Sequence, residues 1–231
     1  MKEARCMFSE YRKDDIQKKL HSIGAAPLDI LIVGATGAGK STTLNAILQK
    51  NEATVGYGAD PETMDTGYYT VNDFLRIWDS PGLGDGVATD LEHKRKIADL
   101  LKKKYQMNYE KYRFIDMVVV IMDASSRDMG TEFDLINNVI LKHISPDRVL
   151  IAINKADCAM YGRHWNFTLN QPDFTLLRTL EEKSLSVRTR IHLSTGMRLP
   201  KPIYYSAEYK YNITKLLDLI IDNIPANKRK D

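Results

Sequence analysis

Apolar residues along the chain fall into short continuous runs, and longer segments of mixed apolar and polar character separate these runs. Residues 28–33, 114–123, 148–154 and 202–206 form such runs, which are rich in aliphatic and aromatic side chains. Short apolar runs with β-branched residues are typical of strands buried on both faces of a sheet. The segments "DTGYYTV" and "FLRIWD" flank the turn residues Asn72 and Asp73, so this stretch predicts a hairpin of two further strands.

The segments between these runs carry apolar residues at helical spacing. We expect helices at about 9–23, 40–50, 89–105, 131–144, 173–188 and 213–224. Strands that alternate with helices imply right-handed crossovers and a parallel sheet. The pattern therefore predicts an α/β fold of three layers. Its centre is a mostly parallel six-stranded sheet with one antiparallel hairpin strand, and helices cover both faces.

Length and composition suit one soluble domain. We expect an N-terminal amphipathic helix extension at 1–26, a main domain at 27–226 and a basic C-terminal tail at 227–231. The N-terminal residues lack the apolar core of a signal peptide, and no apolar run approaches the length of a membrane span. We therefore expect a cytoplasmic protein with no membrane partner. Cys6 and Cys158 lie far apart without metal-ligand spacing, which argues against a disulfide framework or a zinc site.

The net charge of +3 does not indicate a nucleic-acid partner by itself, but the charge is unevenly distributed. Residues 90–113 hold eight Lys or Arg against four Asp or Glu, and the chain ends "NKRKD". Such a run is usually the solvated face of a helix. An acidic partner is the alternative.

The residues that follow each strand are the candidates for chemistry, because ligands of parallel α/β sheets bind beyond the carboxyl ends of the strands. After the first strand, "GATGAGKS" matches G-x-x-x-x-G-K-[ST] in its required position between a strand and a helix. Such a match arises by chance in about one chain in a hundred of this length, so a ligand-free glycine turn is the weaker alternative. Backbone N–H groups of this loop can converge on a phosphate, Lys40 can reach the outer phosphates, and Ser41 can bind Mg²⁺. The predicted nucleotide-binding residues of the loop are Gly34, Thr36, Gly37, Ala38, Gly39, Lys40, Ser41 and Thr42.

The hairpin ends in "DSPG", a D-x-x-G pattern that is weak alone and stronger one hairpin after a phosphate loop. Asp79 can hold the hydration shell of Mg²⁺, and the Gly82 amide can contact the terminal phosphate. The glycine-rich segment that follows suggests a loop that responds to that phosphate.

The motif that selects the base follows residues 148–154. In Asn154-Lys155-Ala156-Asp157, the carboxylate of Asp157 can accept hydrogen bonds from the ring N–H and the exocyclic amine of guanine. Adenine offers no such pair of donors. Asn154 would brace the loop, and the Lys155 stem would lie along the base. After the last strand, the backbone N–H groups of Ser206, Ala207 and Glu208 can reach the guanine carbonyl.

With four motifs in this order at successive strand ends, residues 27–224 resemble the P-loop GTPases of the TRAFAC class, and specifically the Era-like branch. The stretches "GADPETMDTGYYTVNDFLRIWDSPGLGDG" and "HWNFTLNQP" look similar to small GTPases of the ribosome-binding type that prophages and mobile elements carry. The resemblance implies the P-loop GTPase fold, GTP and GDP as ligands, Mg²⁺, and hydrolysis by in-line attack of water. It implies catalytic roles for Lys40, Gly82 and a switch threonine. Thr63 is our choice for that residue, as a catalytic group and a Mg²⁺ ligand, with Thr66 second and Thr70 third.

Two positions depart from better-known GTPases. Leu83 stands where many regulatory GTPases carry the glutamine that orients the attacking water, which predicts slow turnover. Gly37 stands where some relatives carry an asparagine that helps to hold K⁺, so K⁺ activation is not expected. Asp85 and Thr63 remain candidates for positioning the water.

The resemblance leaves the partner open. No KH-type RNA-binding domain is evident, so a ribosome or RNA contact would use the basic segment at 94–104. The 48 residues between Asp157 and Ser206 exceed one crossover helix, and their Trp165, Phe167 and Phe174 predict either a small satellite core or a partner surface. The leading hypothesis is a slowly hydrolysing GTP-dependent switch. A self-assembling scaffold of the septin, dynamin or immunity-associated type, with a nucleotide-dependent dimer, is the alternative. A module that binds nucleotide without turnover is the third possibility.

Overall fold

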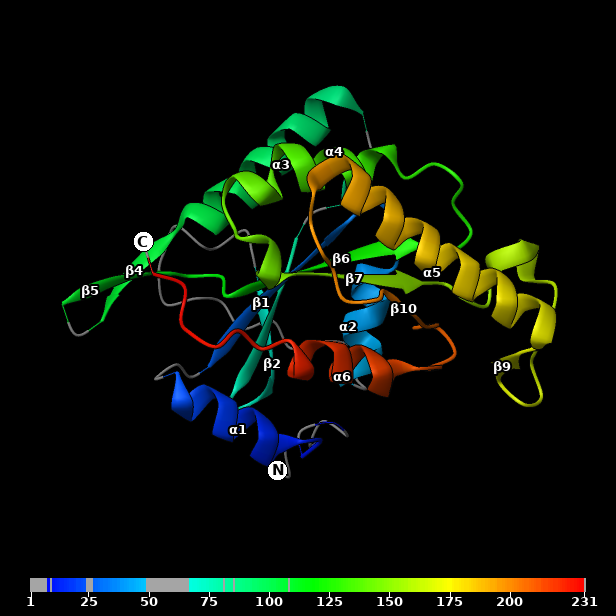
Figure 1. Ribbon diagram of the computed structural model, residues 1–231, viewed down its shortest axis with the longest axis horizontal. Helices are drawn as coiled ribbons and strands as arrows, with labels where there is room; N and C mark the ends of the chain where they lie inside the picture. The colour runs from blue at the N-terminus through cyan, green and yellow to red at the C-terminus, as the bar shows by residue number, and fades with distance from the viewer. Residues whose placement is uncertain are drawn as a thin grey trace.

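The computed structural model describes residues 8, 10–23, 27–48, 67–80, 82–84, 86–107 and 109–230. Cys6, Thr63, Thr66 and Asp85 therefore lie outside the described residues. A central sheet lies between two layers of helices (Figure 1). The helices are α1 (Lys13–Ser22), α2 (Lys40–Leu48), α3 (Val87–Lys102), α4 (Gly130–Asn138), α5 (Phe174–Thr195) and α6 (Ile213–Asp222). Among the described residues, no helix combines the length and the apolar composition that a membrane span requires.

The sheet has the predicted composition. Its strands are β1 (Leu28–Gly34), β2 (Tyr68–Asn72), β3 (Leu75–Asp79), β6 (Met117–Asp123), β7 (Val149–Asn154) and β10 (Ile203–Tyr204). Their order is β10-β7-β6-β1-β3-β2, and β2 runs antiparallel to β3 while the other neighbours are parallel. The prediction of a mostly parallel six-stranded sheet with one antiparallel hairpin strand is confirmed. The carboxyl ends of β1, β3, β6, β7 and β10 consequently meet at one edge.

Burial explains the strand pattern. Every residue of β1 and of β7 is buried, as expected for strands covered on both faces. Helices α3, α4 and α5 contribute to the core on one face of the sheet, and α1, α2 and α6 to the core on the other (Figure 1). Asp173 caps the N-terminus of α5, since its carboxylate accepts a hydrogen bond from the Leu176 amide at 3.0 Å, and Gly196 caps the C-terminus in the left-handed conformation.

The N-terminal helix, α1, lies beside α6 and shares the core on that face of the sheet. Ile16 and Leu20 are buried on the core side of α1. On the polar side, the Arg12 guanidinium donates to Asp218 at 2.8 Å and to Asp222 at 2.7 Å, and both carboxylates belong to α6. These contacts join α1 to the main domain by apolar burial and by charge-assisted hydrogen bonds.

Two hairpins in the structure were not predicted from the sequence. The helix expected at 89–105 ends at Lys102, where the Lys103 backbone turns to an extended conformation. A hairpin of β4 (Lys104–Met107) and β5 (Glu110–Arg113) follows, and it projects from the end of α3 (Figure 1). A short hairpin of β8 (Trp165–Asn166) and β9 (Gln171–Pro172) lies in the insert before α5.

Three further helix boundaries differ from expectation. Helix α1 begins at Lys13 rather than at 9, and α5 continues to Thr195 rather than ending at 188. The helix expected at 131–144 breaks after Asn138 and continues as a 3-10 turn, η2 (Ile140–Lys142).

The three aromatic residues of the insert differ in burial. Trp165 is buried in the core, whereas Phe167 and Phe174 are 66% and 81% exposed. The prediction of a small satellite core is therefore wrong, because Trp165 joins the main core on one face of the sheet and the two phenylalanines are exposed.

A network of buried polar groups joins β1 to the neighbouring strand β3 and to Asp116, which directly precedes β6. The Asp29 carboxylate accepts hydrogen bonds from Arg76 at 2.8 and 2.7 Å and from the Trp78 indole at 2.7 Å. The Asp116 carboxylate, only 2% exposed, accepts the Asp29 amide at 3.1 Å. Burial raises the pKa of Asp116 to about 6. Because burial disfavours the charged form, this carboxyl group holds its proton more tightly in the fold than in the unfolded chain.

Replacement of Asp116 by Asn should change how stability depends on pH. The folded pKa of about 6 lies above the unfolded value, so wild type loses stability as the pH rises through this window. Asp116→Asn removes that loss, and its free energy of unfolding should gain on wild type by roughly 1–3 kcal/mol between pH 4 and pH 7. Urea unfolding at several pH values measures the difference. The exposed control Asp14→Asn should track wild type; parallel curves for Asp116→Asn and wild type would show the expectation to be wrong.

Candidate functional site

The predicted phosphate loop forms one turn between β1 and α2. Gly37 and Gly39 have φ of 76° and 87°, a conformation that glycine adopts without strain. A Cβ on Gly39 would lie 2.3 Å from Asn154 Nδ2, so this position has no room for another side chain. The ammonium group of Lys40 curls over the loop and donates to the carbonyls of Gly34 at 3.2 Å and Ala35 at 3.1 Å. The loop thus presents backbone amides, a helix N-terminus and a lysine in one place, a combination that suits an anion.

The end of β3 lies against this loop. The Ser41 hydroxyl bonds to the Asp79 carboxylate, and burial, which is the largest effect, raises the pKa of that carboxyl group. The second oxygen, Asp79 Oδ1, is buried with no partner among the described residues. A Cβ on Gly82 would lie 2.5 Å from Thr36 Oγ1 and 3.0 Å from Lys40 Nζ, which shows how closely the D-x-x-G backbone approaches the loop.

The donor set at Asp79 suits a divalent cation. A buried carboxylate oxygen without a partner is costly in a folded protein and calls for an explanation. Here it lies beside the Ser41 hydroxyl, and hydroxyl and carboxylate oxygens are ligands that Mg²⁺ and its water shell accept. The residues present therefore fit Mg²⁺. Thr63, the third predicted ligand, lies outside the described residues.

Leu83 follows Gly82 and is held in place. The Leu83 carbonyl accepts a hydrogen bond from the Thr36 amide at 2.5 Å. Leu83 also forms a parallel β-bridge with Ala35, which extends the sheet. Its side chain is 1% exposed and belongs to the core. Leu83 thus contacts the phosphate loop through its backbone, while its side chain is directed into the core.

The other end of the site is organised by Asn154, at the carboxyl end of β7. Its side-chain amide donates to the Ala38 carbonyl at 3.0 Å and accepts the Ala207 amide at 3.0 Å. One residue therefore connects the phosphate loop to the "SAE" segment after β10. Asp157 is 8% exposed; one of its oxygens accepts the Cys158 thiol at 3.1 Å, and burial raises the pKa of that thiol to about 11. Its other oxygen, Oδ1, is buried with no partner among the described residues.

Two of the three backbone amides of the "SAE" segment, which the sequence assigned to the guanine carbonyl, form hydrogen bonds within the protein. The Ser206 amide donates to the Tyr211 carbonyl at 3.1 Å, and its hydroxyl accepts the Tyr209 amide at 3.2 Å. The Ala207 amide is engaged by Asn154. The remaining backbone amide of the triplet is that of Glu208, whose residue is exposed.

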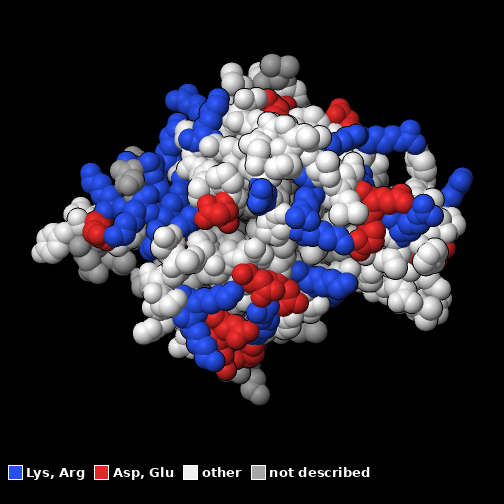
Figure 2. Space-filling model, in the orientation of Figure 1, with Lys and Arg blue, Asp and Glu red and all other residues white. Residues whose placement is uncertain are grey.

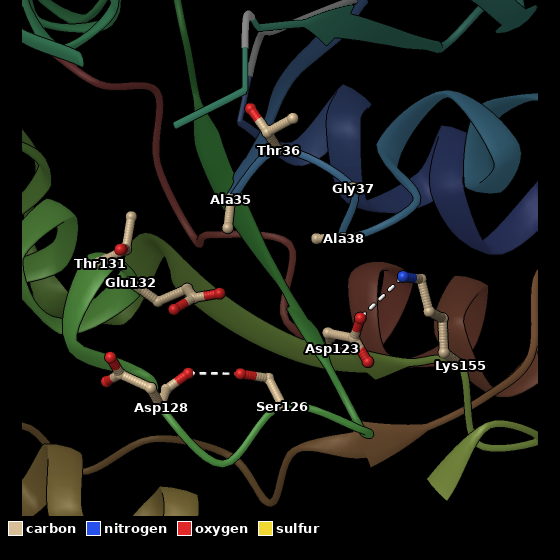
Figure 3. A pocket seen from close by; sticks show the side chains of 10 residues that line it. All are labelled: Ala35, Thr36, Gly37, Ala38, Asp123, Ser126, Asp128, Thr131, Glu132 and Lys155. Atoms are coloured by element: carbon tan, nitrogen blue, oxygen red, sulfur yellow. Dashed lines mark hydrogen bonds and ion pairs between the residues drawn. The ribbon is translucent and has the colours of Figure 1, made fainter. Parts of the chain in front are cut away.

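A cavity of about 320 Å³ beside the phosphate loop is lined in part by residues that no sequence motif marks. Asp123, at the end of β6, accepts the Lys155 ammonium at 2.7 Å, and Lys155 has the left-handed φ of 60° (Figure 3). Burial, with Asp128 and Asp123 nearby, raises the pKa of Glu132. Asp123 follows a buried strand as Asp79 does, so the strand-end rule could have identified it. The lining residues are Ala35, Thr36, Gly37, Ala38, Asp123, Ser126, Asp128, Thr131, Glu132 and Lys155.

Lys183 on α5 fixes the loop that forms the far wall of this cavity. Its ammonium donates to the backbone carbonyls of Asp123 at 3.3 Å, Ala124 at 2.5 Å and Ser126 at 2.6 Å. Burial lowers the pKa of Lys183. No sequence motif marks this lysine, because the three carbonyls it binds lie about 60 residues earlier in the chain.

The family follows from a comparison with known proteins. A model of the 50S ribosome-binding GTPase family matches residues 29–155, which is more than half of the chain. The chain belongs to this GTPase family. The matched region contains the phosphate loop, the D-x-x-G segment and the first residues of the N-K-x-D motif. The prediction of a P-loop GTPase is thereby confirmed at the level of this family.

Relatives of this GTPase include proteins of several kinds. Interferon-gamma-inducible GTPase 10 of Mus musculus is 35% identical over 129 residues, which cover 51% of this chain and 28% of the relative. The tRNA modification GTPase MnmE of Nitratidesulfovibrio vulgaris is 28% identical over 131 residues, covering 55% and 25%. The chain thus spans between a quarter and a third of these curated relatives.

Solved structures show the same fold. Toc33 from Arabidopsis thaliana, in complex with GDP and Mg²⁺, superposes with a TM-score of 0.62 at 14% identity, covering 97% of this chain and 95% of Toc33. The bacterial dynamin GTPase LeoA superposes with a TM-score of 0.54 at 14% identity, covering 95% of this chain and 40% of LeoA. At this identity the comparison supports the three-layer G-domain fold and nothing finer.

Asp157→Asn should exchange the base preference of the site. The carboxylate that would accept two N–H groups of guanine becomes an amide with one donor face, which suits the carbonyl of xanthine. We expect loss of GTP affinity by about a hundredfold or more and a gain of XTP affinity, because a buried polar group is left mismatched with guanine. Titration of fluorescent GTP and XTP measures both constants. Unchanged GTP affinity, with the control Asp14→Asn behaving as wild type, would refute the assignment of Asp157.

Asn154→Ala should weaken every nucleotide without changing the preference. The substitution removes the two hydrogen bonds that link the phosphate loop to Ala207, each 3.0 Å long. Loss of two buried hydrogen bonds predicts roughly a tenfold or greater fall in affinity for GTP and GDP alike. The same titration, with Asn138→Ala on exposed surface as the matched control, gives the comparison. A variant that discriminated GTP from GDP would place Asn154 at the terminal phosphate instead.

Proposed function

We propose that this chain binds GTP and GDP with Mg²⁺, hydrolyses GTP slowly, and acts as a nucleotide-dependent switch. One observation carries the proposal: Asp79 and Asp157 each hold a buried oxygen without a partner among the described residues. Asp79 bonds to Ser41 of the phosphate loop, and Asp157 lies three residues after Asn154, which bonds to Ala38 of the same loop. A phosphate chain between them would place a divalent cation at Asp79 and a base with two N–H groups at Asp157. Toc33, whose fold the chain shares, was solved with GDP and Mg²⁺.

The reaction that these residues support is in-line attack of water on the terminal phosphate. Lys40 would turn from the carbonyls of Gly34 and Ala35 toward the outer phosphates and spread the developing charge. The Gly82 amide would donate to the terminal phosphate, which its close approach to Thr36 and Lys40 permits. Bound Mg²⁺ would neutralise phosphate charge, with Ser41 and Asp79 as its protein contacts and Thr63 as the predicted third.

Slow turnover follows from the position after the D-x-x-G motif. Leucine has no group that orients water, and the Leu83 side chain is buried in the core. Gly37 provides no side-chain ligand for K⁺. Asp85 and Thr63 remain the proposed water-positioning candidates within the chain, and both lie outside the described residues.

Single-turnover phosphate release tests the hydrolytic function. With enzyme in excess over GTP, we expect complete release at a rate well below about 1 s⁻¹, because the orienting group is missing. Lys40→Ala should slow release by about a hundredfold or more, while Lys18→Ala on the exposed face of α1 should leave it unchanged. Asp79→Asn should raise the Mg²⁺ concentration needed for half-maximal rate. Bound GTP that persists for hours without phosphate release would identify a nucleotide-binding module without turnover.

A GTP-dependent scaffold is the second candidate. The higher identity among the two curated relatives described above belongs to the interferon-inducible GTPase, and LeoA, a bacterial dynamin GTPase, shares the fold. Light scattering distinguishes the two functions. Mass that grows with protein concentration in a non-hydrolysable GTP analogue, but not in GDP, would favour assembly, and a dimer that stops at two copies would favour the proposed nucleotide-dependent dimer.

The finer assignments are proposals of the same kind. We propose that the chain is an Era-like GTPase of the small prophage or mobile-element type, that it works in the cytoplasm, and that its switch acts on the ribosome or on RNA. The G domain would occupy 27–226, between the N-terminal helix and the basic tail. The family description and the tRNA modification GTPase among the relatives support an RNA-related partner. A pull-down in GDP against a GTP analogue would reveal it.

A further inference from the structure

The hairpin of β4 and β5 forms a basic surface together with the C-terminal tail. The tail crosses the base of the hairpin, where Lys230 bridges to Tyr112 and the Arg113 amide donates to the Arg229 carbonyl at 2.8 Å. Figure 2 shows lysine and arginine side chains gathered at this end of the molecule, to the left of the view. We call this surface the hairpin patch. Its exposed or half-buried cations are Lys102, Lys103, Lys104, Lys111, Arg113, Lys228 and Lys230.

The hairpin patch carries a surplus of positive charge. In the sequence, residues 99–113 and 227–231 hold eight Lys or Arg against three Asp or Glu. Among the described residues, Glu110 pairs with Lys230 at 2.8 Å, and Asp99 lies 3.8 Å from Lys102. The neighbouring His143 reports the same field, since burial and then the charges of Lys102, Arg229 and Arg113 lower its pKa. A concentrated basic surface of this kind attracts polyanions.

Aromatic rings are interleaved with the cations. The rings of Tyr105 and Tyr112 lie 5.9 Å apart, and Lys228 Nζ stands 5.0 Å from the Tyr105 centroid and 5.9 Å from that of Tyr112. Tyr109, at the turn of the hairpin, is 99% exposed. A fully exposed ring adds nothing to the core, but it offers a flat face on which a base can stack.

The hairpin patch is held rigidly by the tail. The buried Arg229 guanidinium donates to the carbonyls of Ile115 at 2.8 Å, Leu101 at 2.9 Å and His143. The Phe114 amide donates to the Lys103 carbonyl at 2.9 Å, which fixes the two ends of the hairpin to each other. A platform that is ordered before it binds loses less conformational entropy on binding.

We propose that the hairpin patch binds single-stranded nucleic acid, with the cations on the phosphates and Tyr109 stacked on a base. A group of cations beside an exposed ring, here Tyr109, suits a single strand, because the cations can contact phosphates while a base stacks on the ring. A membrane surface is disfavoured, because Tyr109 is the one exposed large apolar side chain in the described part of this patch, and interfacial binding scales with the apolar area that enters the bilayer. This surface lies outside the nucleotide site, so the proposal does not depend on GTP hydrolysis.

Fluorescence anisotropy with labelled 20-nucleotide RNA and DNA strands of mixed sequence tests this assignment. Wild type should bind both or one of them, and the combined variant Lys104→Glu, Lys111→Glu and Lys228→Glu should lose at least tenfold in affinity. Its slope of log K against log salt should fall by about two, since each lost phosphate contact to a single strand removes about 0.7. Tyr109→Ala should weaken binding several-fold without changing the slope.

The control is a charge-matched variant on other faces, Lys18→Glu, Arg188→Glu and Lys215→Glu, whose three cations are exposed. It should bind as wild type does; an equal loss would assign the binding to net charge and overturn the proposal. Absence of wild-type binding, tighter binding to duplexes than to single strands, or tighter binding to phosphatidylserine vesicles would overturn it as well. All variants should keep the wild-type melting temperature and GTP affinity. Failure of wild type to bind GTP would contradict the proposed function but would not affect the proposed binding of single-stranded nucleic acid.

Discussion

The side-chain amide of Asn154 is the contact on which the geometry of the site depends. It lies 2% exposed at the end of β7, donates to Ala38 in the phosphate loop and accepts from Ala207 beyond β10. A side chain that both donates and accepts is required, because one neighbour is a carbonyl and the other an amide. The same contact explains why Gly39 must be glycine, since a Cβ there would collide with the amide. Three strand ends that are distant in sequence are thereby fixed relative to one another.

Around this fixed frame the fold keeps two carboxylate oxygens unsatisfied. Leaving a buried polar atom without a partner costs on the order of 1–3 kcal/mol, and the described residues hold such atoms at Asp79, Asp157 and Trp165. Two of the three, Asp79 and Asp157, belong to segments that contact the phosphate loop through Ser41 and Asn154 respectively. A chain selected for stability alone would satisfy them with nearby donors, so their retention agrees with sites that trade stability for binding. The pKa of Asp79 is raised because burial opposes its charge more strongly than the nearby Lys40 and the hydrogen bonds from Ser80 and Ser41 favour it.

The sequence was sufficient where short-range physics decides the structure. A largely apolar run followed by glycines predicts β1 and its loop, and the alternation of apolar runs with amphipathic segments predicts the six-stranded sheet. The β4–β5 hairpin was missed because the strand-like alternation of residues 104–107 spans only four positions directly after a helix, and because its anchor, Arg229, lies more than 100 residues away. Lys183 was missed for the same reason. Asp123, in contrast, followed the strand-end rule and could have been found.

The segment after β3 limits how the bound nucleotide can be hydrolysed. The backbone of this segment extends the sheet beside the phosphate loop, where the Leu83 carbonyl accepts a hydrogen bond from the Thr36 amide. The Leu83 side chain is buried in the core. Turning Leu83 outward would expose a leucine at a cost of about 2 kcal/mol and would also break this hydrogen bond. The position that orients water in other GTPases is therefore occupied by a structural residue here. A group that orients the water must therefore come from another residue of the chain, with Asp85 and Thr63 as the proposed candidates, or from a partner that docks beside the loop.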